Sequence, residues 1–247
     1  MNTIYESLVA RKSTRQFEEK QVPREIKQAL FNAGFQAPTA GNQMLYSIID
    51  VTDQGLKDQL AETCDHQPFI AKAPIVLIFL ADTRRWLDAY HAAGVEAREP
   101  GMGDLFLAIQ DAVIAAQNIV VAAESFGLGS CYIGDILENV ETHRALLKLD
   151  EFVVPIAMLV IGYPTEGQKN RQKQNRFKAE YIVHENHYRR LTETELREMH
   201  LKQSGKPDYD FDSTITAFCN RKYMSDFAKE MTRSSEIYAN AFLKKGV

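Results

Sequence analysis

The stretch Arg11-Lys12-Ser13-Thr14-Arg15-Gln16-Phe17 places three cations and two hydroxyls within five positions and ends on an aromatic ring. A short helical pattern precedes this basic segment, and Pro23 restarts a helix after it, so we expect residues 11–17 to be extended. In an extended segment alternate side chains share a face, which groups Arg11 with Ser13 and Arg15. Two guanidinium groups beside a hydroxyl suit a phosphate. The alternative is a solvated basic patch.

The bulk composition is typical of a globular protein with a sizeable core. Of the 247 residues, 45% are hydrophobic and 25% charged, and the net charge of −4 gives no general attraction to nucleic acid or to an anionic membrane. The amino-terminal residues lack a signal-peptide pattern, and the longest apolar run, residues 152–161, is too short to span a bilayer. Three widely spaced cysteines fit a reducing compartment. We therefore expect a soluble, cytoplasmic protein.

Helical and strand patterns alternate along most of the chain. The spacing of apolar residues predicts helices over 23–35, 56–63, 104–126 and 191–201, and strands over 46–52, 73–81 and 152–162. This alternation favours helices layered on a sheet. Residues 205–213 form a polar linker, after which apolar and aromatic residues recur at helical spacing. We expect residues 1–204 to form one domain and residues 205–247 an appended helical extension.

The predicted helix over 104–126 has a wide stripe of apolar residues and many small residues around it. Little polar surface is left, so we expect the helix to be buried nearly all round. A central position in the core or a subunit interface would explain such a helix.

Two polar loops could contact a ligand. Residues 37–43, Ala-Pro-Thr-Ala-Gly-Asn-Gln, combine Pro and Gly with side-chain donors and acceptors between a helix and a strand. They could surround a flat polar ligand or form an ordinary connection. Residues 127–135 are rich in glycine, so their backbone amides could approach a ligand closely. Tyr132 occupies the sixth place where a dinucleotide fingerprint needs glycine, so we reject a Rossmann interpretation.

Other chemistry-bearing residues are weaker candidates. Cys131 is more plausibly a small buried residue than a nucleophile, because no Cys-His-Asn pattern accompanies it. His184 and His187 lack partner ligands for a metal. The basic stretch of residues 169–178 could bind nucleic acid, but a mobile loop with one or two phosphate-contacting cations is the more economical interpretation.

Together the clusters resemble the FMN-dependent nitroreductase family. The motifs are Arg11-x-Ser13-x-Arg15-x-Phe17, Ala37-Pro38-Thr39-Ala40-Gly41-Asn42 and Gly127-Leu128-Gly129-Ser130-Cys131-Tyr132-Ile133-Gly134. The similarity extends from about residue 4 to residue 188 and favours the larger, NADPH-preferring branch, which includes flavin reductases. It implies an α+β fold: a nitroreductase-like three-layer α/β/α sandwich with a mainly antiparallel central sheet, assembled as an intertwined homodimer with FMN at the interface.

The resemblance also implies roles for individual residues. Arg11 and Ser13 match phosphate-binding positions, Arg15 a cation beside the ribityl and pyrimidine side of the flavin, and Gln67 a residue at the pyrimidine edge. Arg176 matches a second phosphate-binding arginine. Alternation places Lys12 on the opposite face from Arg11, and Lys12 is included among the expected cofactor-binding residues as part of the same basic segment. The expected cofactor-binding residues are Arg11, Lys12, Ser13, Arg15, Thr39, Ala40, Gly41, Asn42, Gln67, Tyr132, Ile133, Gly134, Asp135 and Arg176.

The implied function is that of an FMN-dependent NAD(P)H oxidoreductase. It would reduce nitroaromatics, quinones or related acceptors by ping-pong hydride transfer through flavin N5, with no catalytic side chain and no metal. An NAD(P)H:flavin reductase is the alternative within this class. A flavin-binding carrier or sensor without turnover, and a nucleic-acid binder that uses residues 169–178, are alternatives from other classes. Met44-Leu45-Tyr46 replaces the Gln-Pro-Trp of many relatives, which leaves the packing on the substrate side open.

Overall fold

The computed structural model describes residues 2–243. The chain divides into two compact units. The first comprises Met1–Arg171 together with Glu230–Val247, and the second comprises Gln172–Lys229. The expected boundary between residues 204 and 205 stays a prediction.

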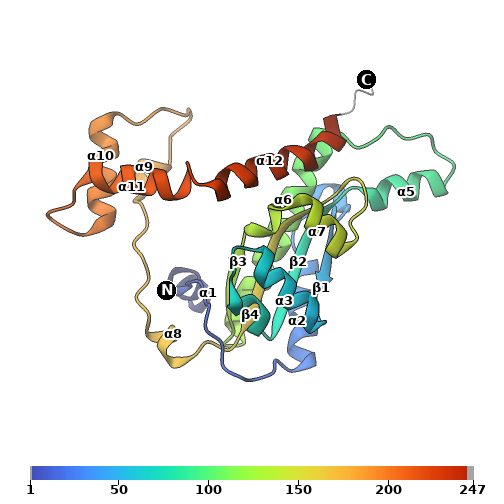
Figure 1. The fold of residues 1–247 in the computed structure, drawn as a ribbon, viewed down its shortest axis with the longest axis horizontal. Helices are drawn as coiled ribbons and strands as arrows, with labels where there is room; N and C mark the ends of the chain where they lie inside the picture. Colours follow the sequence, from blue (N-terminus) through green and yellow to red (C-terminus); the bar gives the residue numbers. More distant parts are fainter. Residues whose placement is uncertain (1, 244–247) are drawn as a thin grey trace. The chain divides into compact units, whose positions relative to one another are not determined.

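The first unit is built on a four-stranded antiparallel sheet (Figure 1). Its strands are β1 (Tyr46–Asp50), β2 (Ile75–Asp82), β3 (Gly129–Ile133) and β4 (Val153–Gly162), in the spatial order β1-β2-β4-β3. Every residue of β2 is buried, because this apolar run is central in the sheet and covered on both faces. The three strands predicted from sequence are confirmed.

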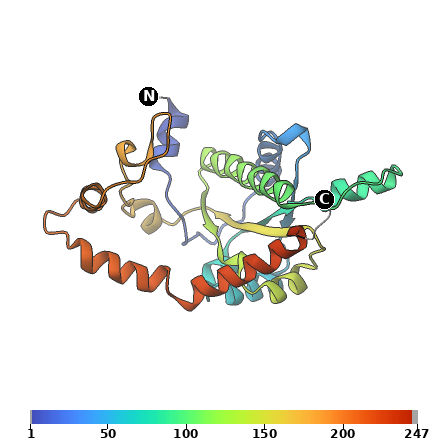
Figure 2. The ribbon, with the colours of Figure 1, turned by 90° about the horizontal axis from the view of Figure 1, so that it is seen from above.

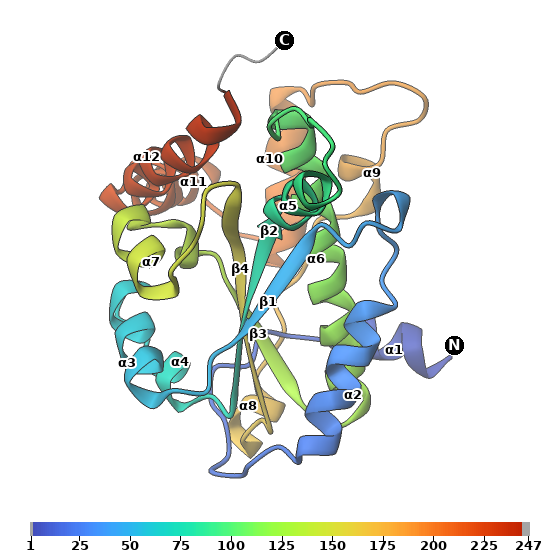
Figure 3. The same ribbon diagram turned by 90° about the vertical axis from the view of Figure 1, so that its right-hand side faces the viewer.

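Helices cover both faces of the sheet (Figure 3), and the view from above shows the same three layers (Figure 2). On one face lie α2 (Arg24–Phe35) and α6 (Met102–Ser125), and Leu30 and Ile119 pack there against Phe79 of β2. On the other lie α3 (Gln54–Thr63), α4 (Pro68–Lys72) and α7 (Val140–Leu147), with Leu60 packed near Ile78 and Met158. The three-layer α/β/α sandwich is confirmed.

Helix α6 lies against the sheet along its small-residue face. Ala108, Ala112 and Ala115 are fully buried, and Asn118 Nδ2 donates to the Ala33 carbonyl oxygen at 3.2 Å, which joins α6 to α2. The helix is long and apolar enough to cross a membrane, but a buried core helix has the same composition. The expectation of burial all round is wrong for the single chain, because Phe106 and other outward-facing residues are exposed.

Several elements escaped the sequence patterns. The glycine-rich run at 127–135, whose backbone amides were expected to be open to a ligand, is mostly strand β3, since long-range pairing with β4 decides its conformation. The short elements not predicted include α5 (Arg84–Ala92), α8 (Glu166–Asn170), η1 (Ala40–Asn42) and η2 (Asp135–Leu137). The predicted amino-terminal helical turn is α1 (Thr3–Ala10).

The second unit is helical and polar. It contains α9 (Ala179–Ile182), α10 (Glu193–Ser204) and α11 (Phe211–Lys222), and Arg197 of α10 pairs with Asp212 of α11 at 2.9 Å. Helix α12 (Asp226–Asn240) belongs to the first unit from Glu230 onward and is followed by η3 (Ala241–Leu243). There Tyr238 and Phe242 are buried, and the Phe242 ring packs edge-on against Phe152 with ring centroids 5.3 Å apart. The end of the predicted extension is therefore part of the core of the first unit.

Candidate functional site

The basic segment (residues 11–17) is extended and runs beside strand β3. The Thr14 backbone N–H donates to the Ser130 carbonyl oxygen at 2.9 Å, and Ser13 and Ser130 form a parallel bridge. Thr14 is buried against Gly129, where a Cβ atom would stand 2.2 Å from the Thr14 Oγ1 atom. Glycine is therefore required at position 129. Because Thr14 points inward, alternation directs its two neighbours to the other face.

The other end of the basic segment is held by strand β4 and helix α8. Phe17 bridges to Pro164, and its ring occupies the space where a Cβ atom on Gly162 would be 2.8 Å away. The buried side chain of Gln168 donates to the Ser13 carbonyl oxygen at 3.1 Å and accepts from the Arg15 backbone N–H at 3.3 Å. Gln168 thus fixes the backbone between the two arginines. Sequence reasoning missed it, because a surface helix with a single Gln carries no local signal.

Lys12 is engaged elsewhere in the fold. Its Nζ atom donates to the carbonyl oxygens of Lys169 at 2.5 Å and Arg171 at 2.6 Å, at the carboxyl end of α8. A cation at such an end also interacts favourably with the helix dipole. Lys12 therefore anchors α8 to the basic segment, while Arg11 and Arg15 form no salt bridge with any residue that the structure describes.

Arg11, Ser13 and Arg15 gather around one point of strand β3. The Ser13 hydroxyl contacts the Cys131 thiol, and both arginines lie within electrostatic reach of it. Burial nevertheless raises the pKa of Cys131, so the thiol is protonated at neutral pH and is no nucleophile. The Arg11 Nη1 atom is buried and has no hydrogen-bond partner. A buried guanidinium nitrogen without an acceptor is costly, which points to an anionic ligand on this face.

The loop at Thr39–Asn42 is held by a buried acid in helix α6. Asp111 accepts hydrogen bonds from the Thr39 hydroxyl, from the Ala40 backbone N–H at 3.1 Å and from the Leu45 backbone N–H at 3.0 Å. Between these points Gly41 and Asn42 are left-handed, with φ of 55° and 57°. Glycine adopts this conformation freely and asparagine tolerates it, which explains the sequence of the loop.

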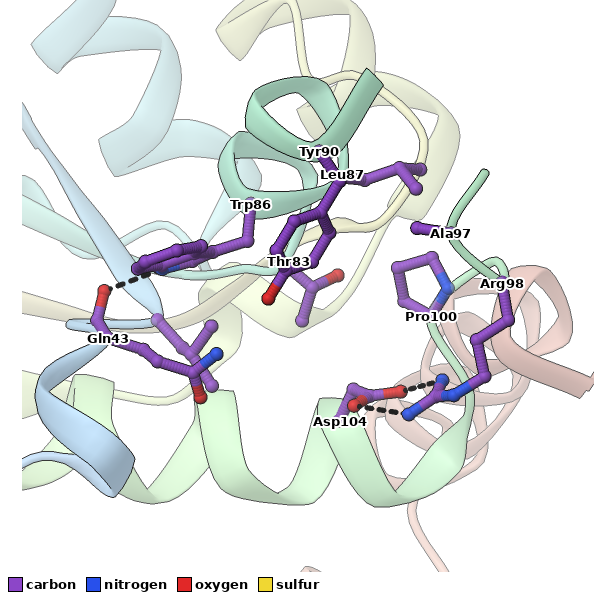
Figure 4. Close-up of a pocket in the computed structure, with 10 residues that line it drawn as sticks. Gln43, Thr83, Trp86, Leu87, Tyr90, Ala97, Arg98, Pro100 and Asp104 are labelled. Atoms are coloured by element: carbon purple, nitrogen blue, oxygen red, sulfur yellow. Dashed lines mark hydrogen bonds and ion pairs between the residues drawn. The ribbon is translucent and has the colours of Figure 1, made fainter. Parts of the chain in front are cut away.

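A cavity of about 260 Å³ lies beside the same loop (Figure 4). Trp86 and Tyr90 of α5 line it, and the Trp86 Nε1 atom donates to the Gln43 carbonyl oxygen at 2.8 Å. Arg98 and Asp104 border it as a bidentate pair, with N–O distances of 2.6 and 3.1 Å, which lowers the pKa of Asp104. The loop is thus supported by Asp111 on α6 and by Trp86 on α5.

The remaining candidates of the first unit lie at the end of strand β3, in the turn that follows it, and at Gln67 before α4. Ile133 is buried, Gly134 is exposed and Asp135 begins η2. The Tyr132 hydroxyl donates to the Gln117 Oε1 atom at 3.4 Å, and burial raises the pKa of Tyr132 to about 12. Gln67 precedes α4 and donates to the Cys64 carbonyl oxygen at 2.8 Å. Tyr132 lies within electrostatic reach of Arg11, and Asp135 lies within electrostatic reach of Cys64, the residue that Gln67 contacts.

The structure brings together only part of the predicted site within one chain. Arg11 lies near Glu124 of α6, whereas the Thr39–Asn42 loop is attached at Asp111 of the same helix. At about 1.5 Å per residue, those two acids are about 20 Å apart along α6. Figure 3 shows the chain entering α2 at its lower end, after the basic segment, and the Thr39–Asn42 loop following α2 at its upper end. Arg176 belongs to the second unit, so its role stays a prediction.

Comparison with known proteins assigns the chain to a family. The profile of the Nitroreductase family matches residues 8–163, so the chain belongs to the nitroreductase family. The oxygen-insensitive NADPH nitroreductase of Salmonella typhimurium is 33% identical over 193 residues, which cover 78% of each chain. An NADPH-dependent oxidoreductase of Staphylococcus aureus is 25% identical over 95% of this chain and 90% of its own length. The solved structure of B. megaterium NfrA2 matches with a TM-score of 0.80 at 26% identity, covering 97% of this chain and 98% of that one.

Proposed function

We propose that this protein is an FMN-dependent NAD(P)H oxidoreductase that reduces nitroaromatics, quinones or related acceptors. The observation that carries the proposal is the buried, unpartnered Nη1 atom of Arg11 beside Ser13 and Arg15 on the β3 edge. This donor set fits the phosphate end of FMN, which is anionic and rich in acceptors. Bound FMN would supply the redox chemistry, accepting hydride at N5 from NAD(P)H and passing the electrons to the acceptor.

The chain's own residues bind and orient the cofactor. Arg11 and Ser13 would hold the phosphate, and Arg15 would provide positive charge that favours the anionic reduced flavin. Gln67 and the backbone N–H groups at Tyr132–Asp135 would offer hydrogen bonds to the flavin, as the sequence resemblance implies. The sequence resemblance matches Arg176 of the second unit to a second phosphate-binding arginine, and this role stays a prediction. Lys12 acts through the backbone of the basic segment, since its ammonium group is bound to two carbonyl oxygens.

A homodimer completes this site. The separation of about 20 Å along α6 between the Arg11 end and the Thr39–Asn42 loop favours a loop that reaches the flavin bound by the partner chain. The exposed apolar residues on the outer face of α6 are suited to such an interface. They include Phe106, Leu107, Val113 and Ile114. The negative net charge and the three dispersed cysteines support a cytoplasmic location.

An anaerobic absorbance titration tests the proposed function. The purified protein should be yellow, and NADPH or NADH should bleach the flavin band in proportion to the donor added. A nitroaromatic or quinone should then restore the band, whereas restoration by free FMN or riboflavin alone would favour a flavin reductase. A yellow protein that neither donor bleaches would identify a carrier without turnover, and a colourless protein that takes up no FMN would contradict the proposal.

A further inference from the structure

Glu138 is a buried acid that the flavin site does not use. It lies between η2 and α7, its side chain is only 6% exposed, and its Oε1 atom is buried without a hydrogen-bond partner. The next residue, Asn139, is left-handed, with φ of 50°, so the backbone turns sharply at this point. A carboxylate buried without a partner is strongly disfavoured, whereas its protonated form is tolerated.

The charged groups around Glu138 are predominantly acidic. Asp135 of η2, Asp65 of the loop after α3 and Glu230 of α12 act on it from three elements. Burial first, and then these acids, raise the pKa of Glu138 to about 7. The carboxyl group of Glu138 therefore changes between its protonated and ionised forms within the physiological pH range.

The other titratable neighbours do not neutralise Glu138. Arg233 is paired with Glu230 and with Glu141 of α7, each at 2.8 Å. The two ring nitrogens of His143 lie 3.0 Å from the Ile136 carbonyl oxygen and 2.9 Å from the Thr63 hydroxyl, and burial lowers its pKa. The thiol of Cys64 has its pKa raised to about 12 by burial and by Asp135 and Glu138, so it carries no charge here.

This acidic cluster lies where three elements meet. The Glu230 Oε1 atom accepts from the Asn139 backbone N–H at 3.0 Å and from the Ser234 hydroxyl at 2.7 Å, and that hydroxyl accepts from the Val140 backbone N–H at 3.1 Å. The Asn139 side chain donates to the Thr63 carbonyl oxygen at 3.0 Å. These hydrogen bonds form a joint that connects α12 and α3 to Asn139 and Val140, which follow the Tyr132–Asp135 turn in the chain.

We propose that Glu138 is a positioning residue whose proton holds the Gly134–Asp135 turn against α12 and α3. When the carboxyl is neutral, it can remain buried beside Asp135 and Glu230. When it is ionised, it repels both acids and loosens the joint. Because Asp135 belongs to the turn assigned to the flavin, the effect on FMN rests on the proposed function. The retention of FMN therefore becomes pH-dependent through a residue that does not touch it.

Melting temperatures of the FMN-bound protein between pH 5.5 and 8.5 test the ionisation. The folded protein binds the Glu138 proton up to about pH 7, whereas the unfolded chain releases it near pH 4.5. Stability should therefore fall as pH rises from 4.5 through 7. Glu138→Gln should abolish this pH-dependent fall in stability. Glu141→Gln removes an exposed acid with a low pKa, so the fall should remain in that variant. If the melting temperatures of the wild type and of Glu138→Gln changed with pH in the same way, the proposal would be overturned.

A second variant tests the proposal independently, in case Glu138→Gln does not fold. Asp65→Asn removes one repelling charge, and asparagine tolerates the positive φ of 61° at this position. The pKa of Glu138 in the folded protein should then fall, so the loss of stability should end at a lower pH and be smaller in total than in the wild type. An unchanged pH profile in this variant would contradict the proposed cluster.

The rate of FMN release, followed by the gain in flavin fluorescence, tests the link to the turn. Release from the wild type should be at least threefold faster at pH 8 than at pH 6, and Glu138→Gln should show no such change. A wild-type rate independent of pH would overturn the positioning role. Protein that takes up no FMN would overturn the proposed function, while the melting curves would still decide whether Glu138 ionises as described.

Discussion

The Asp111 carboxylate, buried in the middle of helix α6, accepts a hydrogen bond from the Ala40 backbone N–H at 3.1 Å. Through this bond and its partners at Thr39 and Leu45, one acid fixes both ends of a loop with successive left-handed residues. A single helical side chain thus provides the rigidity that a ligand-binding loop needs.

Replacing Asp111 should destabilise the protein and release the loop. Asp111→Ala leaves several buried donors without an acceptor, so we expect a loss of about 2–4 kcal/mol in the free energy of unfolding. Urea denaturation measures this loss. Asp150→Ala, at an exposed position, is the matched control and should change stability by less than about 0.5 kcal/mol. Equal midpoints for the two variants would contradict the role of Asp111.

Removing Arg11 should weaken FMN binding. A charge-assisted hydrogen bond contributes about 1.5–3 kcal/mol, so Arg11→Ala should raise the Kd for FMN by about tenfold or more. Combining it with Arg176→Ala should weaken binding further if Arg176 also contacts the phosphate. Arg24→Ala with Arg190→Ala removes two exposed arginines as a control. Fluorescence titration of FMN measures the affinities, and an unchanged Kd in the Arg11→Ala, Arg176→Ala protein would refute both assignments.

Lys12 and Arg11 should differ in what their replacement changes. Lys12→Met removes the anchor for the carbonyl oxygens of Lys169 and Arg171, so we expect faster tryptic cleavage after these two residues. The Kd for FMN should change less than in Arg11→Ala. Lys72→Met, at an exposed position in α4, is the control. A loss of FMN affinity as large as that of Arg11→Ala, without faster cleavage, would show that Lys12 contacts the cofactor directly.

Gly129→Ala should displace the basic segment. The new methyl group would stand 2.2 Å from the Thr14 Oγ1 atom, and such crowding costs about 1–3 kcal/mol. Both the melting temperature and FMN affinity should fall. Gly103→Ala, which meets no atom within 4 Å in helix α6, should be neutral or stabilising by up to about 1 kcal/mol. Adding Thr14→Ala to Gly129→Ala should restore part of the loss, and the absence of any rescue would argue against this contact.

The strongest sequence predictions concern elements whose pattern is local. The apolar run at β2 and the small-residue stripe of α6 determine a buried strand and a core helix, because periodicity and burial coincide there. Strand β3 escaped prediction, since its glycines suggest a turn. Its pairing of Gly129 with Gly162 depends on a strand more than twenty residues further along the chain.

The sequence by itself determined that Arg11, Ser13 and Arg15 share a face, because alternation in an extended segment is a local property. Only the tertiary structure decided that Lys12 is bound to α8, that Asp111 holds the Thr39–Asn42 loop, and that Glu138 is buried among acids. Each of these three roles depends on partners far along the chain. Burial and charge acquire their energetic consequences only when folding brings such partners together.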